Sequence, residues 1–313
     1  MSGADYWFDS DDGLRLYSRV YAGPAAEAPV ILCLHGLMRT GRDFDDLAVR
    51  LARRYRVIVP DVRGRGQSAR DAHFSNYQIP VYLNDVRTLL GGLGAARVSV
   101  IGTSMGGLMA MVLAVTEPQL IERVVLNDIG PEIDPRGLER IMSYVGKMPP
   151  VSSWPEAIAQ TRSVYGSAWP DLSEARWEKI TRLTYRVNAA GVPEVDADPM
   201  IGEAARPAPG AAPSLWPLWG ALAGVPVLAI RGAHSDILSA ATLERMQRTK
   251  PDLKVVTVPN RGHAPLLDEP ECLAAIDDFL ATSPSGAGGA RAGFWLRKLL
   301  RLWAWAGRWG WRV

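Results

Sequence analysis

The stretch that decides the fold is Val98-Ser-Val-Ile-Gly-Thr-Ser-Met-Gly-Gly-Leu-Met-Ala-Met111. It begins with an apolar, mostly β-branched run that predicts a buried strand, and it ends in an apolar run that predicts a helix. Between them stands Ser104, with Gly102 and Gly106 two residues away on either side. A serine at a sharp strand-to-helix turn is exposed to a substrate, and the glycines remove side chains that would collide as the chain reverses. Ser104 is therefore a candidate nucleophile; the alternative is a polar residue in a glycine-rich turn.

The segments on both sides of this stretch alternate between strand-like and helix-like patterns. Strands are predicted over 14–21, 29–36, 56–61, 98–102, 123–127, 226–232 and 253–258, and helices over 44–53, 81–93, 108–116, 241–248 and 271–280. Such alternation predicts an α/β fold with a mostly parallel, doubly wound sheet covered on both faces. The rhythm stops near residue 130 and returns near 223. We therefore expect a core of residues 1–130 and 223–282, an inserted helical cap at 131–222, and a flexible linker and tail at 283–313.

Composition narrows the function class. The 313 residues are 48 % apolar and 22 % charged, which is ordinary for a globular protein. The N-terminus has no signal-peptide pattern, no uncharged run is long enough for a transmembrane helix, and the two cysteines form no disulfide framework. A cytoplasmic protein is the expectation. With four scattered histidines and no paired metal-ligand spacing, no metal site is expected. No dinucleotide fingerprint follows the first strand either, so no cofactor is expected.

Four motifs together resemble an α/β-hydrolase with a cap, over residues 5–282. Gly102-Thr-Ser-Met-Gly resembles the nucleophile elbow of that family. His35-Gly-Leu-Met follows a buried strand, as the family's oxyanion loop does, and Asp61-Val-Arg-Gly-Arg-Gly-Gln-Ser matches the family's segment after the next strand. Gly262-His-Ala-Pro follows the last strand, where the family keeps its catalytic base. The resemblance implies a serine hydrolase.

A serine nucleophile needs a base, and the base needs a carboxylate. His263 is the best candidate base, because it lies on a loop after a late strand and preserves the order serine, acid, histidine. Asp236, in Gly232-Ala-His-Ser-Asp, stands where the resemblance places the acid. Asp128 follows the preceding core strand and is the alternative acid, since some family members take their acid from there.

The resemblance also implies secondary roles. The backbone N–H groups of Leu37 and Met105 match the family's oxyanion hole. His35 is expected to be structural, and Asp61, Arg63 and Ser68 are expected to hold their loop together.

The expected reaction is hydrolysis of a carboxylic ester or lactone of a small apolar substrate through an acyl-enzyme. Ser104 argues against the branches of the family that place an aspartate nucleophile at the elbow. Carbon–carbon bond hydrolases of the family share Ser104-Met-Gly-Gly, but Thr103 and Ala264 replace their usual neighbours of the serine and histidine. Carbon–carbon hydrolysis on the same triad remains an alternative, as does a non-catalytic ligand-binding protein.

The tail raises a separate hypothesis. Residues 283–313 carry six Lys or Arg and no acidic residue. On a helical projection of 294–312, five of these basic residues fall within an arc of about 100°, opposite a Leu- and Trp-rich stripe. This pattern favours contact with the inner face of an anionic membrane. A nucleic-acid arm is disfavoured, because the stripe is as apolar as it is basic. The alternative is a helix that docks on the protein's own body.

Overall fold

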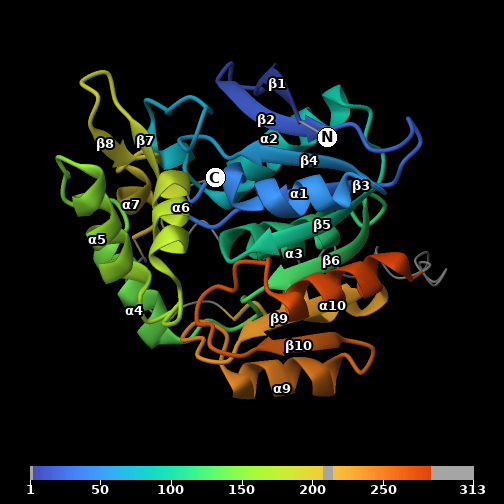
Figure 1. The fold of residues 1–313 in the computed structure, drawn as a ribbon. Coiled ribbons are helices and arrows are strands. Elements are labelled where there is room, and N and C mark those ends of the chain that lie inside the picture. Colours follow the sequence, from blue (N-terminus) through green and yellow to red (C-terminus); the bar gives the residue numbers. More distant parts are fainter. Residues whose placement is uncertain (1–2, 207–213, 283–313) are drawn as a thin grey trace.

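The computed structural model describes residues 3–206 and 214–282, so the tail at 283–313 lies outside the described residues. Eight strands form the main sheet in the order β1-β2-β4-β3-β5-β6-β9-β10 (Figure 1). Their bounds are Ala4–Asp9 (β1), Arg15–Tyr21 (β2), Val30–Leu34 (β3), Arg56–Asp61 (β4), Val98–Thr103 (β5), Ile121–Asn127 (β6), Val227–Gly232 (β9) and Lys254–Val258 (β10). The six neighbouring strands β4, β3, β5, β6, β9 and β10 pair in parallel, and β1 and β2 join them antiparallel. The predicted fold class is confirmed.

Helices cover both faces of this sheet, and each strand alternates its side chains between them. Along β3, Ile31 and Cys33 pack with α1 (Asp45–Leu51) and α10 (Pro270–Ala281). Leu32 and Leu34 point to the other face, which α2 (Ile79–Gly92), α3 (Met105–Thr116) and α9 (Ala240–Thr249) cover. Strands buried on both faces explain why the sequence shows continuous apolar runs rather than alternation.

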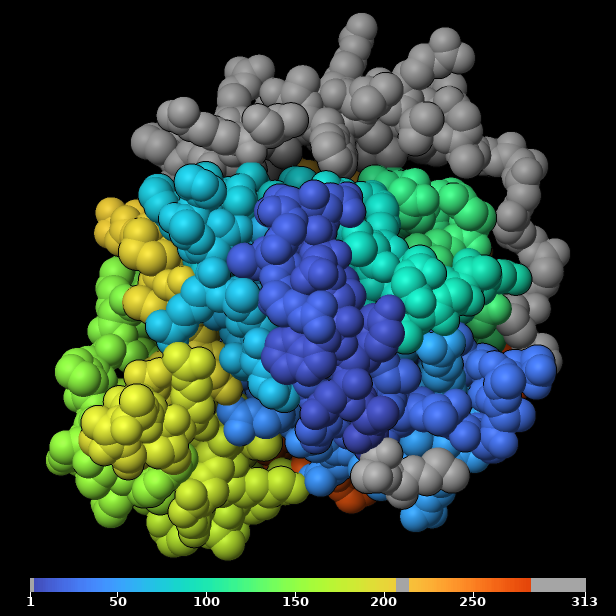
Figure 2. Space-filling view, turned by 90° about the horizontal axis from the view of Figure 1, so that it is seen from above, coloured from blue at the N-terminus to red at the C-terminus, as the bar shows by residue number. Residues whose placement is uncertain are grey.

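The chain between β6 and β9 leaves the sheet. Residues 135–204, which we call the cap segment, contain α4 (Pro135–Tyr144), α5 (Trp154–Tyr165), α6 (Glu174–Thr184), β7 (Tyr185–Val187), β8 (Pro193–Val195) and α7 (Ile201–Ala204). Seen from above in Figure 2, the cap segment, in green and yellow, forms a lobe beside the blue N-terminal strands. Its own apolar cluster includes Trp169, Trp177 and Ile180.

Two features of this region differ from the expected helical cap over 131–222. The short strands β7 and β8 form an antiparallel pair inside it. Helix α8 (Trp216–Ala221) packs with the core, because Trp219 is buried in the cluster beneath α3. None of the described helices is both long and apolar enough to cross a bilayer. The remaining short elements are the 3-10 helices η1 (Gly41–Phe44), η2 (Phe74–Asn76) and η3 (Leu222–Gly224).

Candidate active site

Ser104 occupies the turn between β5 and α3, in a backbone conformation that only strong local constraints maintain. Its φ is +52°, in the left-handed region that costs a non-glycine residue roughly 1–3 kcal/mol. The turn is tight. A Cβ on Gly102 would lie 2.4 Å from the carbonyl oxygen of Gly106, and one on Gly106 would lie 2.0 Å from the carbonyl oxygen of Leu34. Both glycines are therefore required by close backbone approach.

His263 lies on the loop after β10 and reaches Ser104. Its Nε2 is 2.9 Å from the Ser104 hydroxyl oxygen, and its Nδ1 is 2.8 Å from Oδ2 of Asp128. With the proton on Nδ1, the imidazole donates to Asp128 and can accept the Ser104 proton at Nε2. This connected arrangement is the geometry that activates a serine.

Asp128 is fully buried at the end of β6, and its carboxylate is held by further donors. The backbone N–H of Gly232 donates to Oδ1 at 2.8 Å, and the Ser235 hydroxyl donates to Oδ2 at 2.6 Å. Both donors belong to the end of the neighbouring strand β9 and the loop after it. The carboxylate is thereby fixed in orientation as well as in place.

Among the described residues, no hydrogen bond or ion pair joins His263 to Asp236, the acid favoured by the sequence. Its two oxygens accept from Arg140 of α4, at 2.5 Å from Nε and 2.8 Å from Nη2. The backbone of Asp236 also packs closely on Gly137, since a Cβ there would lie 2.1 Å from the Asp236 carbonyl oxygen. The cap segment thus engages Asp236, and the carboxylate beside His263 is the alternative, Asp128.

The two residues expected to form the oxyanion hole flank Ser104. Met105 is the first residue of α3, whose leading N–H groups have no partner within the helix. Leu37 follows Gly36, and a Cβ on Gly36 would lie 3.9 Å from the Ser104 Cβ. The loop that carries Leu37 therefore lies against the serine. The start of a helix favours negative charge at this point.

His35 is fully buried and acts as a brace beneath this loop. Its Nδ1–H donates to the Gly36 carbonyl at 2.8 Å, and its Nε2 accepts from the Val62 N–H at 3.0 Å. These two contacts fix the neutral tautomer. Burial lowers the pKa of His35 from its ordinary value to about 4, because the charged ring would be desolvated.

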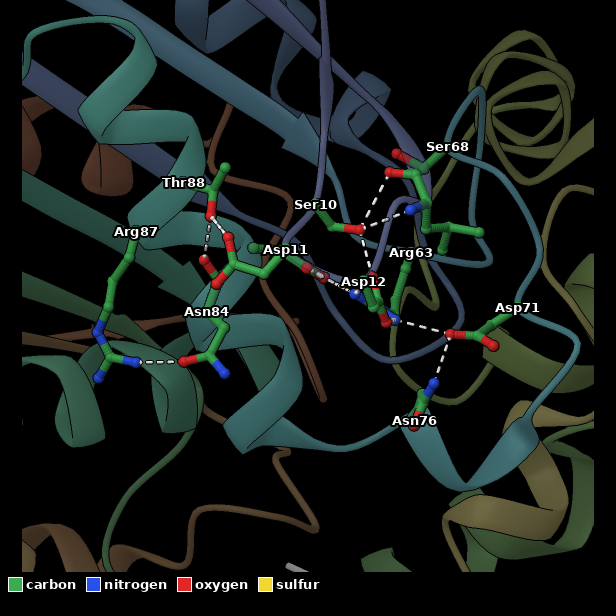
Figure 3. A network of polar contacts seen from close by, with 12 residues as sticks. Ser10, Asp11, Asp12, Arg63, Ser68, Asp71, Asn76, Asn84, Arg87 and Thr88 are labelled. Atoms are coloured by element: carbon green, nitrogen blue, oxygen red, sulfur yellow. Dashed lines mark hydrogen bonds and ion pairs between the residues drawn. The ribbon is translucent and has the colours of Figure 1, made fainter.

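The side chains of Asp61, Arg63 and Ser68, which were expected to hold their loop together, all make contacts within or across the segment 61–68 at the end of β4. The Asp61 carboxylate accepts from the N–H groups of Gly41 and Gln67, and burial raises its pKa to about 6. The Ser68 hydroxyl donates to the Asp61 carbonyl at 2.6 Å. Figure 3 shows the Arg63 guanidinium between Asp12 and Asp71.

Residues of the cap segment that hold the loop of His263 could not be recognised in the sequence. The indole N–H of Trp169 donates to the Ala264 carbonyl at 2.8 Å, and the Gly262 N–H donates to the Ala168 carbonyl at 2.7 Å. The residues on both sides of His263 are thus bonded to the cap segment. No local pattern in the sequence signals these contacts, because they join segments about 95 residues apart.

A cavity of about 210 Å³ opens onto Ser104 and His263. Its walls include Tyr144, Tyr165, Trp169, Ile180 and Leu266. Each basic residue of the wall is ion-paired; the pairs are Arg39–Asp43, Arg42–Asp196, Arg176–Asp268 and Lys179–Asp46. Within the described ranges, no group of three or more His, Cys, Asp or Glu is arranged to hold a metal ion.

Comparison with known proteins agrees with the fold. Residues 31–276 match the model of the alpha/beta hydrolase family. A 3-hydroxybutyrate-oligomer hydrolase of Cupriavidus necator is 35 % identical over 82 % of this chain and 90 % of its own length. A 2-(acetamidomethylene)succinate hydrolase of Mesorhizobium japonicum is 28 % identical over 80 % of this chain and 88 % of its own.

Among solved structures, an alpha/beta hydrolase of Novosphingobium aromaticivorans is 43 % identical, with a TM-score of 0.83, over 89 % of this chain and 98 % of its own. The family match covers most of the chain, and the fold and the elbow fit it. This chain belongs to the α/β-hydrolase family.

Proposed function

We propose that the protein is a serine hydrolase that cleaves a carboxylic ester through an acyl-enzyme. Ser104 is the nucleophile, His263 the general base and acid, and Asp128 the carboxylate that orients His263. One observation carries the proposal: His263 lies 2.9 Å from the Ser104 hydroxyl oxygen and 2.8 Å from the buried Asp128 carboxylate. Asp236 is not part of the proposed triad, because it is committed to Arg140.

The steps follow from this geometry. The Ser104 oxygen attacks the ester carbonyl while His263 Nε2 takes the hydroxyl proton, and Asp128 stabilises the imidazolium. The carbonyl oxygen becomes an oxyanion that the N–H groups of Leu37 and Met105 receive. Removing one such donor typically costs about 10²–10³-fold in kcat. His263 then gives its proton to the leaving alcohol, and water releases the acid by the same route in reverse.

For the substrate we propose a short aliphatic ester, with oligomers of 3-hydroxybutyrate as the first candidates. The cavity walls are apolar and aromatic near Ser104, and their basic residues are neutralised by ion pairs. The Cupriavidus relative supports the hydroxy-acid class by its name. A lactone would place the same carbonyl at Ser104 and belongs in the same substrate panel.

The test is labelling by a fluorophosphonate probe, with mapping of the modified peptide, followed by turnover of a 3-hydroxybutyrate dimer. We expect a label on Ser104 in the native protein and none after heat denaturation. The Ser104→Ala variant should lose both labelling and turnover. Wild-type hydrolysis by Ser104→Ala would refute the proposed nucleophile.

The same proteins and assays distinguish two alternative functions from ester hydrolysis. Carbon–carbon hydrolysis is favoured by Ser104-Met-Gly-Gly and by the Mesorhizobium relative. It predicts turnover of vinylogous diketone substrates with no turnover of esters. A non-catalytic binding protein predicts that Ser104→Ala keeps full ligand affinity and that the wild type turns over neither class.

We also propose that residues 294–312 hold the protein on the inner face of an anionic membrane. The proposal rests on the sequence pattern of basic and Trp-rich faces. Deletion of residues 283–313 should abolish co-sedimentation with vesicles rich in phosphatidylserine while ester turnover in solution persists. Equal sedimentation of the full and truncated chains would overturn it.

A further inference from the structure

Two arginines of the segment after β4, Arg63 and Arg65, are both only 1 % exposed, yet their surroundings are opposite. Arg63 is bound by three carboxylates, of Asp12, Asp71 and Asp85, and the first two are labelled in Figure 3. Arg65 contacts only uncharged groups. Within the described residues, no carboxylate lies within 4.0 Å of its guanidinium. Burying a charge without a counter-ion is costly, so this position calls for an explanation.

The contacts of Arg65 lead to the two residues of the proposed oxyanion hole. Its Nε–H donates to the Leu37 carbonyl at 3.0 Å, and its Nη2 lies 3.7 Å from the Met105 sulfur. A single rigid guanidinium therefore bridges the loop after β3 and the first residue of α3.

The rest of the guanidinium is fixed just as firmly. Nη1 donates to the Arg63 carbonyl at 2.7 Å and to the Tyr82 hydroxyl at 2.9 Å. The charge lies 4.9 Å from the centre of the Tyr82 ring and 5.7 Å from that of Tyr77. These partners hold the side chain in place, and none of them carries a negative charge.

The charge also stands at an unfavourable place in the resting protein. The N-terminus of α3 carries the positive end of the helix dipole, so a cation beside Met105 is repelled. An anion formed at the turn is attracted both to the cation and to the helix N-terminus, and this attraction offsets the repulsion. We propose that Arg65 is a positioning residue that sets the spacing of the Leu37 and Met105 donors and supplies the positive field toward which the oxyanion forms. The inference rests on the proposed function, because it needs an oxyanion at Ser104.

A purely structural role makes a different prediction. Arg123, which is 4 % exposed, provides the matched control. It too donates to neutral acceptors, the Phe279 carbonyl at 2.7 Å and the Leu280 carbonyl at 3.3 Å, and lies 5.8 Å from the centre of the Phe279 ring. Arg123 sits near the start of β6, whereas the active site lies beyond the strand's other end. Replacing it should lower stability and leave turnover intact.

The experiment compares the wild type with Arg65→Met, Arg65→Lys and Arg123→Met, using ester turnover and binding of butylboronic acid. The trigonal boron accepts the Ser104 oxygen, the serine proton goes to His263, and the adduct is a tetrahedral anion. Boronate affinity therefore reports stabilisation of negative charge, whereas KM for the neutral ester reports ordinary binding.

We expect Arg65→Met to lower kcat and boronate affinity together by about tenfold to hundredfold, less than the loss of a direct donor, with KM within about twofold. Arg65→Lys should lose less kcat and boronate affinity than Arg65→Met, because it keeps the positive charge. It should still lose some of both, because lysine lacks the planar guanidinium that spans Leu37 and Met105. Arg123→Met should match the wild type in both measurements. If Arg65→Met does not fold, Arg65→Lys decides: a fall in kcat at constant KM supports the proposal.

Wild-type kcat and boronate affinity in a folded Arg65 variant would overturn the inference and leave the proposed function standing. A wild-type protein that neither binds the boronate nor carries a fluorophosphonate label would overturn the proposed function, and this inference with it.

Discussion

Oδ2 of Asp128 lies 2.8 Å from Nδ1 of His263, and that carboxylate is held by donors from the end of β9 and the loop after it. The Gly232 N–H and the Ser235 hydroxyl both contact it, so its orientation does not depend on His263. Asp236, only one residue beyond Ser235, faces the cap segment and pairs with Arg140. Two carboxylates at adjacent strand ends thus have separate partners: Asp128 contacts His263, and Asp236 pairs with Arg140 of the cap segment.

Asp128→Asn should lower kcat by about 10⁴-fold, because the amide N–H₂ would face Nδ1 and favour the tautomer that carries its proton on Nε2. In that tautomer His263 cannot accept the Ser104 proton. Steady-state turnover of an ester, with thermal melts to verify folding, is the measurement.

The matched control is Asp236→Asn. It removes one charge from an ion pair whose side chains are 26 % and 35 % exposed, so the cost in stability is expected to be about 1 kcal/mol or less. Its kcat should remain within about threefold of the wild type. The reverse ranking of the two variants would return the acid to Asp236.

Ser104 and His263, which the structure brings together, could be singled out because local sequence marks them. Gly102 and Gly106 mark the turn, because a Cβ at either position would collide with the backbone. His263 is the histidine on the loop after the last strand. The acid could not be chosen in this way. Asp128 and Asp236 both follow parallel strands, and both lie at the same edge of the sheet. Which of them contacts His263 therefore depends on tertiary partners such as Arg140.

The secondary structure between β6 and β9 could also be predicted only in part from the sequence. Strands β7 and β8 have three residues each, too short for a periodicity to appear. Helix α8 looks like part of an amphipathic block, and only the burial of Trp219 beneath α3 places it with the core. Long-range packing decides both cases.

Trp169→Phe should lower kcat by about threefold to tenfold, because the Ala264 carbonyl loses its donor and the residue after His263 loses its tie to the cap segment. An unpaired buried carbonyl also costs about 1–3 kcal/mol of stability. Trp219→Phe is the control, since its indole N–H donates at 2.9 Å to Thr249 on the core, and Trp219 is as buried as Trp169. Both variants should lose similar stability, and equal kcat in the two would refute a role for the Trp169 contact.

Gly106→Ala should be severely destabilising, by about 3 kcal/mol or more, because its Cβ would lie 2.0 Å from the backbone of β3. Any relief must move β3 against the elbow, so activity should fall as well. Gly91→Ala in α2 is the control: its Cβ meets nothing within 4 Å, and it should stabilise by about 0.5–1 kcal/mol. Urea denaturation of both variants decides, and a Gly106→Ala protein of wild-type stability would contradict the contact.

His35 should make the protein less stable in mild acid. Its pKa is lowered to about 4 in the fold by burial, against an ordinary value of 6.5. Between these values the unfolded chain binds the proton and the native state does not, so stability is fully present above pH 6.5 and is lost as pH falls toward 4. Because a pKa difference of one between the folded and unfolded chains corresponds to about 1.36 kcal/mol, the loss of stability amounts to about 3 kcal/mol.

Urea denaturation at pH 7 and at pH 4.5 tests this for the wild type and for His35→Gln. Asp61, whose pKa is raised to about 6 by burial, acts in the opposite direction, because it gains stability as it is protonated. Its contribution is common to both proteins and cancels in their difference. The variant should be less stable at pH 7, because it loses the brace between Gly36 and Val62, but it should lose about 2–3 kcal/mol less than the wild type on acidification. His73→Gln, at an exposed histidine, should follow the wild-type curve. Equal losses for His35→Gln and the wild type would show that the histidine is protonated within the fold.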